Sequence, residues 1–276
     1  MPYKMQSKPN RNSSILRQIK RQLRNPRKRL LIEIISAIAG ISLIISLIVS
    51  NKKPSTEDLK DGVAYIKTLE KKDTSKTEHT IKEIKRKERK AALESGEQDV
   101  WKYFNDSVVL GDSRAVGFKY YGFIPEERTF AEAGATLRNI PDYIEEIKNV
   151  NPSSIILCFG LNDISIGYWK TSEEYIEELD KIIALLHTEL PDATVFVNSI
   201  IPAIDPAFEK SEKWRDIPDW NEDVKEHCEE EKIPYIDITD VVKEHENLYD
   251  IDGIHMRKEF YPYWAIAIIT EVTENE

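Results

Sequence analysis

The chain has 276 residues, of which 41% are hydrophobic and 32% charged, and this length and composition exclude a collagenous or wholly disordered protein. Its net charge of −10 is unevenly spread: residues 1–30 carry ten Lys and Arg and no acidic residue, whereas residues 98–276 carry 16 Lys and Arg against 38 Asp and Glu. So acidic a body repels polyanions, which argues against nucleic acid as a partner. Two cysteines exclude a disulfide-stapled scaffold and a Cys-rich zinc module.

The first segment predicts a membrane anchor. Residues 30–49 are twenty consecutive residues with one charge, Glu33, and as a helix they would span about 30 Å, the thickness of a bilayer core. The run is longer than the apolar core of a cleaved signal peptide, and no cleavage pattern follows it. The basic residues 1–29 would hold the N-terminus in the cytoplasm. We therefore expect an uncleaved signal anchor that places the rest of the chain outside the cytoplasm and in contact with the bilayer.

Residues 50–98 are polar and highly charged, and they predict a helical stalk. Leu59, Val63, Ile66 and Leu69 recur at helical spacing. Two interpretations remain open, a solvated spacer and a helix that pairs weakly with a partner.

From residue 99 to residue 276 short apolar runs alternate with helical patterns. The expected strands are Ser107–Leu110, Thr129–Ala131, Ser154–Phe159, Thr194–Ser199 and Pro234–Ile238. The expected helices are residues 138–149, 172–189, 214–231 and 257–273. Continuous apolar strands are typical of a sheet covered on both faces, so this part of the chain predicts one α/β domain with a parallel sheet. The reactive residues should then lie in loops beyond the carboxyl ends of the strands.

Those loops carry side chains suited to nucleophilic catalysis. The first expected strand runs into Gly-Asp-Ser-Arg at 111–114, where Ser113 can project its hydroxyl into the crevice. A glycine, Gly134, follows the second strand, and Gly-Leu-Asn-Asp at 160–163 follows the third. Near the C-terminus, Asp252 precedes His255 by three residues, a spacing that lets a carboxylate orient an imidazole that accepts the serine proton.

The ordered set GDS, a following glycine, GxND and a terminal DxxH resembles the SGNH (GDSL-type) hydrolase superfamily over residues 105–262. The resemblance implies a three-layer α/β/α, flavodoxin-like fold with a five-stranded parallel sheet, and no metal or organic cofactor. It also implies Ser113 as nucleophile, His255 as base and Asp252 as its orienting acid. The N–H groups of Ser113 and Gly134 and the side chain of Asn162 match the oxyanion hole. The sequence departs from the family pattern at Arg114, where leucine is common.

Each assignment has a structural alternative: Ser113 as a helix cap, Gly134 as a turn residue, Asn162 and Asp163 as caps or turn residues, and Asp252 with His255 as a helix-start pair. No HExxH or comparable spacing points to a metal. We expect Arg114 and Trp169 to contact substrate, Trp169 through an aromatic face that can stack on a sugar ring. Core packing or loop anchoring is the open alternative for Trp169.

Two functions from different classes follow. The first is an extracytoplasmic serine esterase or O-acyltransferase that acts on acyl esters, expected to be acetyl groups, of cell-envelope carbohydrate. In the transferase case a membrane-bound acyltransferase is an expected partner. The second is a catalytically silent envelope module that binds glycan or a membrane partner. The presence of Ser113, Asp252 and His255 together favours the enzyme.

Overall fold

The computed structural model describes residues 26–51, 56–70 and 75–274. The chain divides into two compact units, Met1–Thr74 and Ser75–Glu276. The described elements of the first unit are the helices α2 (Pro26–Asn51) and α3 (Thr56–Glu70). Of the predicted basic arm at 1–29, residues 1–25 lie outside the described residues.

α2 covers the predicted transmembrane segment at residues 30–49. Among the residues with a described placement, no helix is both long enough and apolar enough to cross a bilayer, so a membrane-spanning helix is not confirmed.

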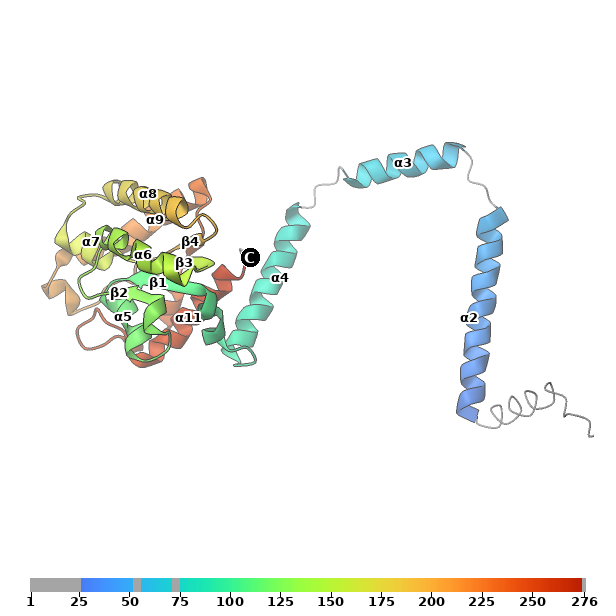
Figure 1. The fold of residues 1–276 in the computed structure, drawn as a ribbon, viewed down its shortest axis with the longest axis horizontal. Coiled ribbons are helices and arrows are strands. Elements are labelled where there is room, and N and C mark those ends of the chain that lie inside the picture. Colours follow the sequence, from blue (N-terminus) through green and yellow to red (C-terminus); the bar gives the residue numbers. More distant parts are fainter. Residues whose placement is uncertain (1–25, 52–55, 71–74, 275–276) are drawn as a thin grey trace, which may run out of the picture. The chain divides into compact units, whose positions relative to one another are not determined.

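The second unit contains a sheet of five parallel strands in the order β2-β1-β3-β4-β5 (Figure 1). The strands are β1 (Ser107–Gly111), β2 (Thr129–Ala131), β3 (Ser154–Cys158), β4 (Thr194–Asn198) and β5 (Tyr235–Ile236). The helices are α4 (Ser75–Glu94), α5 (Ser113–Tyr120), α6 (Ile140–Val150), α7 (Leu161–Ile166), α8 (Ser172–Glu189), α9 (Ile217–Glu231), α10 (Thr239–Glu244) and α11 (Tyr261–Val272). Short 3₁₀ helices include η1 (Val100–Asp106), η3 (Leu137–Asn139) and η5 (Glu212–Asp216). The predicted α/β fold with a five-stranded parallel sheet is confirmed.

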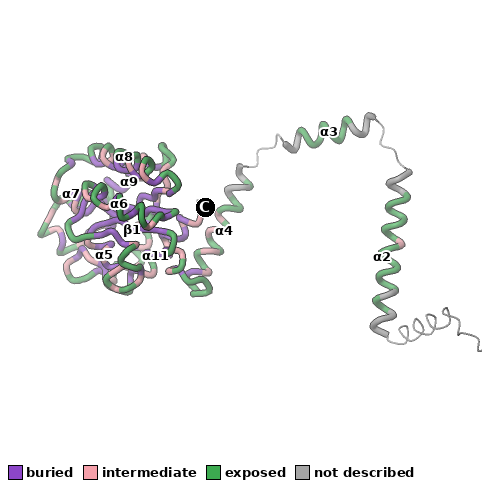
Figure 2. Tube along the Cα trace, in the orientation of Figure 1, coloured by how far each residue is buried: buried purple, intermediate pink, exposed green. Residues whose placement is uncertain are grey.

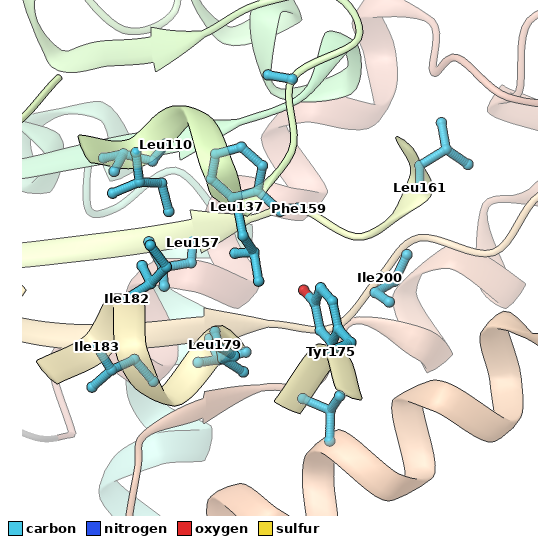
Figure 3. Close-up of a cluster of buried hydrophobic side chains, with 14 of the residues drawn as sticks. Leu110, Leu137, Leu157, Phe159, Leu161, Tyr175, Leu179, Ile182, Ile183 and Ile200 are labelled. Carbon is cyan, nitrogen blue, oxygen red and sulfur yellow. The ribbon is translucent and has the colours of Figure 1, made fainter. Parts of the chain in front are cut away.

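Helices cover both faces of the sheet, which is why its strands are apolar runs without alternation. Along β1, Val108 and Leu110 face α6, α8 and α9, whereas Val109 faces α5 and α11. The close-up in Figure 3 shows the first of these cores, in which Leu110 and Leu157 of the strands lie near Ile182 of α8. Figure 2 shows the strands as the most continuously buried part of the unit. The strand order reverses between β1 and β3, so the loops after β1, β2 and β3 meet at a switch point, where ligands of such sheets bind.

The unit with the sheet begins earlier than the sequence predicts, because α4 belongs to it. α4 lies within the predicted stalk at 50–98, yet it packs against the C-terminal end of α11. Arg86 forms ion pairs with Glu271 and Glu274, and Arg89 donates to the carbonyl oxygen of Thr273. These cations meet the negative end of the α11 dipole, so they are docking contacts of α4.

We expect Leu93→Ala to destabilise the domain. Leu93 lies in the last turn of α4 and is 4% exposed, in a cluster with Val100 and Phe104. Its truncation therefore leaves a cavity and should lower the free energy of unfolding by about 2–4 kcal/mol. Ile84, on the same helix, is 51% exposed, and Ile84→Ala should change it by less than about 0.5 kcal/mol. Urea unfolding followed by tryptophan fluorescence measures both. Equal, small effects would show that α4 is only a spacer.

Candidate active site

Three side chains from two distant segments meet at the carboxyl edge of the sheet. Ser113 is the first residue of α5 and directly follows β1, and its Oγ lies 2.9 Å from His255 Nε2. His255 Nδ1 lies 2.6 Å from Asp252 Oδ2. The structure therefore brings together the predicted nucleophile, base and acid as a chain of two hydrogen bonds.

The loop that carries Asp252 and His255 is folded around the Asp252 carboxylate. Asp252 Oδ1 accepts hydrogen bonds from the backbone N–H groups of Ile254 (2.9 Å) and His255 (3.0 Å). Gly253 has φ +68°, and a Cβ there would lie 2.3 Å from the carbonyl oxygen of Ile204, so only glycine fits this turn. The residues between the acid and the base thus hold both side chains on one side of the loop.

Electrostatics fixes the proton positions in this chain. Burial alone would raise the pKa of Asp252, but hydrogen bonds from the His255 and Ile254 backbone N–H groups and from the imidazole outweigh it and lower the pKa to about 2. Asp252 is therefore ionised at neutral pH and accepts the proton of His255 Nδ1. This leaves Nε2 as the acceptor for the Ser113 hydroxyl, the tautomer that a general base requires.

The predicted oxyanion donors lie on the loops after the three neighbouring strands β1, β2 and β3. Gly134 is exposed, has φ +82° and sits in the loop after β2. Asn162 lies in the first turn of α7, and its Nδ2 donates to the carbonyl oxygen of Ala135 at 3.0 Å. This bond joins the Asn162 side chain to the Gly134 loop. The second N–H of the same amide has no protein acceptor within the described part of the chain, so it is available to a bound oxyanion.

Asp163 is predicted only as a cap or turn residue, but in the structure it also connects two of the site loops. Its carboxylate accepts from the backbone N–H of Leu137 at 3.1 Å and from that of Gly160 at 2.9 Å. The side chain is 0% exposed. One buried carboxylate therefore fixes the Asn162 turn against the segment that follows Gly134. Leu137 and Asp163 are 26 residues apart in sequence, and the only sequence signal for Asp163 is its place in the GxND motif.

Replacing Asp163 with asparagine should change how stability depends on pH. Burial raises the pKa of Asp163 to about 7, although the Leu137 and Gly160 N–H groups favour the ionised form. Because the pKa of Asp163 is higher in the folded state than its unfolded value of about 3.8, the protonated carboxyl group stabilises the folded state. This stabilisation is fully present below about pH 3.8 and is lost as the pH rises through 7. Relative to Asp163→Asn, the wild-type chain should therefore lose up to about 4 kcal/mol of unfolding free energy between pH 4 and pH 8.

Urea unfolding of both proteins across this pH range measures the difference. The exposed Asp192 provides the control, since Asp192→Asn should follow the wild-type pH dependence. If the unfolding free energies of wild type and Asp163→Asn depended on pH in the same way, Asp163 would not have the raised pKa that the prediction requires.

Arg114 and Trp169, the two side chains predicted to contact substrate, are both buried. Arg114 is 3% exposed, pairs with Asp112 at 3.1 Å and donates to the carbonyl oxygen of Ile201. It supports the start of α5 from within the protein. Trp169 is 7% exposed and packs edge-on against Tyr175. Arg114 is thus engaged in an ion pair and a hydrogen bond and Trp169 in aromatic packing, and their contact with substrate stays a prediction.

The described residues contain no group of three or more His, Cys, Asp and Glu side chains placed to hold a metal ion. Both cysteines are buried and free, and burial raises the pKa of the Cys228 thiol to about 12. Neither thiol is therefore suited to act as a nucleophile. The acid–base chemistry of this site rests on Ser113, His255 and Asp252.

Known proteins show a likeness to this part of the chain. The model of the GDSL-like lipase/acylhydrolase family matches residues 109–261. No curated protein matches the chain. Solved structures similar to it include a putative acylhydrolase from Bacteroides fragilis (18% identity, TM-score 0.47, covering 61% of this chain and 86% of that one). Others are a GDSL-like lipase from Bacteroides thetaiotaomicron (17%, 0.49, 62% and 90%) and a lipase/acylhydrolase from Enterococcus faecalis (16%, 0.47, 61% and 95%).

Proposed function

We propose that this chain, which belongs to the GDSL-like lipase/acylhydrolase family, cleaves a carboxylic ester through an acyl-serine intermediate on Ser113. The observation that carries the proposal is the distance of 2.9 Å between Ser113 Oγ and a His255 imidazole that Asp252 orients. The alternative, a silent binding module, does not require this alignment of three side chains.

The reaction proceeds in two halves. Ser113 Oγ attacks the acyl carbon while His255 Nε2 takes the hydroxyl proton, and the carbonyl oxygen becomes an oxyanion. The ester C–O bond then breaks, and His255 returns the proton to the departing alcohol. In the second half water attacks the acyl-serine, His255 accepts its proton, and the carboxylic acid leaves as Ser113 Oγ regains a proton. In a transferase, a sugar hydroxyl takes the place of this water.

Covalent labelling with a fluorophosphonate tests the mechanism, because this reagent reacts only with an activated serine. We expect one label per chain, on Ser113, and none in Ser113→Ala. A folded chain that resists the reagent would contradict the proposal and favour the silent module.

The finer proposal is that the ester is an acetyl group on cell-envelope carbohydrate, and that hydrolysis or transfer follows according to the acceptor. His255 is 44% exposed, which leaves room for either water or a sugar hydroxyl at Nε2. Incubation with a chromogenic acetyl ester, with and without an oligosaccharide acceptor, separates the two. Free acetate alone indicates an esterase, whereas acetylated sugar detected by mass spectrometry indicates a transferase. If neither free acetate nor acetylated sugar is formed, the proposed acetyl substrate is contradicted.

We also propose that the catalytic unit acts outside the cytoplasm, anchored at residues 30–49, with residues 1–29 inside. The support is the apolar run and the basic residues before it, together with apolar side chains of α2, such as Leu43, that are exposed. Protease added to intact cells or spheroplasts should remove residues beyond about 50 and leave the basic arm. Protection of residues 75–276 would contradict this location and the envelope substrate together.

A further inference from the structure

Arg138 lies beside the candidate oxyanion loops in an unusual setting. It belongs to η3, is exposed, and its guanidinium carbon lies 4.3 Å from the ring centroid of Tyr168 and 5.4 Å from that of Trp169. Its neighbour Leu137 is fully buried in the core shown in Figure 3, and the Leu137 backbone is bonded to Asp163. A planar cation is thus held on aromatic rings by a fixed backbone.

This guanidinium has no carboxylate partner in the described part of the chain, although the domain around it is strongly acidic. Three other arginines of the unit are paired with carboxylates: Arg114 with Asp112, Arg215 with Glu212, and Arg86 with Glu271. Another three, Arg89, Arg128 and Arg257, donate to backbone carbonyl oxygens instead. The five N–H donors of Arg138 are therefore free to bind an anion, and the fork geometry of a guanidinium suits a carboxylate or a phosphate group.

Arg138 and Tyr168 are both connected to the site by short segments. Arg138 is four residues after Gly134, and Tyr168 follows α7, whose first turn holds Asn162. A six-residue helix is about 9 Å long, so α7 separates Tyr168 from Asn162 by a distance that one bound sugar or two can bridge. Tyr168 remains 48% exposed beside the cation, unlike the buried Trp169.

We propose that Arg138, stacked on Tyr168, binds a negatively charged group of the ester substrate, so that this chain prefers acylated saccharides bearing a carboxylate or a phosphate over neutral ones. The inference rests on the proposed esterase function and deepens it by naming the charge of the substrate. A preorganised cation contributes to binding because little side-chain freedom is lost when the anion arrives.

The test compares kcat/KM for three acetyl esters of matched structure: acetylated glucose, acetylated glucuronic acid and acetylated glucose 6-phosphate. We expect the wild-type chain to prefer at least one of the anionic esters over the neutral one. The relative kcat/KM of the two anionic esters shows whether a carboxylate or a phosphate binds better. In Arg138→Met the ratio of anionic to neutral kcat/KM should fall by about 10- to 100-fold, mainly through KM, the size expected for one charge-assisted bidentate contact. Arg138→Lys should restore part of the ratio. Added salt should reduce the ratio in the wild type but leave that of Arg138→Met unchanged.

Arg215→Met is the matched control, because Arg215 lies 3.9 Å from the ring centroid of Phe208 but is paired with Glu212. This variant should keep the wild-type ratio. An unaltered ratio in Arg138→Met, or a ratio lowered equally in Arg215→Met, would overturn the proposal and leave Arg138 as a cover for Trp169.

Failure of the esterase proposal is distinguishable from failure of this one. If none of the esters is cleaved, binding of glucuronic acid and of glucose 6-phosphate to Ser113→Ala can still be followed by NMR titration. Binding that Arg138→Met abolishes in this background supports the anion site without the activity. No binding of either anion overturns it.

Discussion

Ser113→Ala should abolish formation of the acyl-enzyme and reduce ester turnover to background, with little change in melting temperature. Ser113 is half-buried at the start of α5, and apart from the contact with His255 its hydroxyl contributes little packing. His255→Ala should disable the same step by removing the proton acceptor. Asp252→Asn should retain an imidazole of the wrong orientation or tautomer and cost up to about 10⁴-fold in kcat, by analogy with a related triad.

The chain offers a matched control for the acid. Asp250 lies on the same loop, and its carboxylate accepts from the Ile251 N–H at 2.8 Å, without a contact to the imidazole. Asp250→Asn should therefore retain most of the activity. Stopped-flow measurement of the release of a chromogenic alcohol compares the variants. If Asp252→Asn were as active as Asp250→Asn, another group would have to orient His255.

Asn162→Ala should lower kcat by about 10²–10³-fold while KM changes far less, equivalent to about 2.7–4 kcal/mol of transition-state stabilisation. Charge develops on the carbonyl oxygen during attack by Ser113, and an amide already fixed by its bond to Ala135 can meet this charge without reorganisation. Steady-state kinetics with the same chromogenic ester, normalised to the fraction of folded protein, measures the effect.

The same substitution also removes a contact to the Gly134 loop, so a second variant separates the two consequences. Asn139 caps this loop by accepting from the Thr136 N–H at 2.9 Å, and it is not one of the predicted oxyanion donors. Asn139→Ala should lower stability by about 1 kcal/mol and retain most of the turnover. Equal losses of kcat in both variants would mean that Asn162 acts only by ordering the loop.

The sheet could be predicted because strands that are buried on both faces are continuous apolar runs in the sequence. β2 occupies its predicted range, and α8 coincides with the predicted helix at 172–189, whose start is capped by Thr171. The GDS, GxND and DxxH motifs located the candidate site because each directly follows a strand or forms a tight local turn. These features depend on neighbours in the sequence.

Other features depend on partners far along the chain, and the sequence alone did not reveal them. Arg86 and Arg89 appear solvated within a charged segment until the end of α11, some 185 residues later, is placed beside them. Asp163 is fixed by Leu137, which no local pattern indicates. Tyr168 and Trp169 are adjacent aromatic residues, and only the packing against Tyr175 decides that the tryptophan is the buried one.

The docking of α4 has a mechanical consequence. Tension applied to the sheet-containing unit through Ser75 reaches the helix first, at contacts that begin with Lys82 and Glu274 and end with buried Leu93. Those contacts would open one after another from the N-terminal end, and the five strands would bear load only after α4 had detached. The carboxyl edge of the sheet, which carries Ser113, is therefore not the first part of the unit to bear the load.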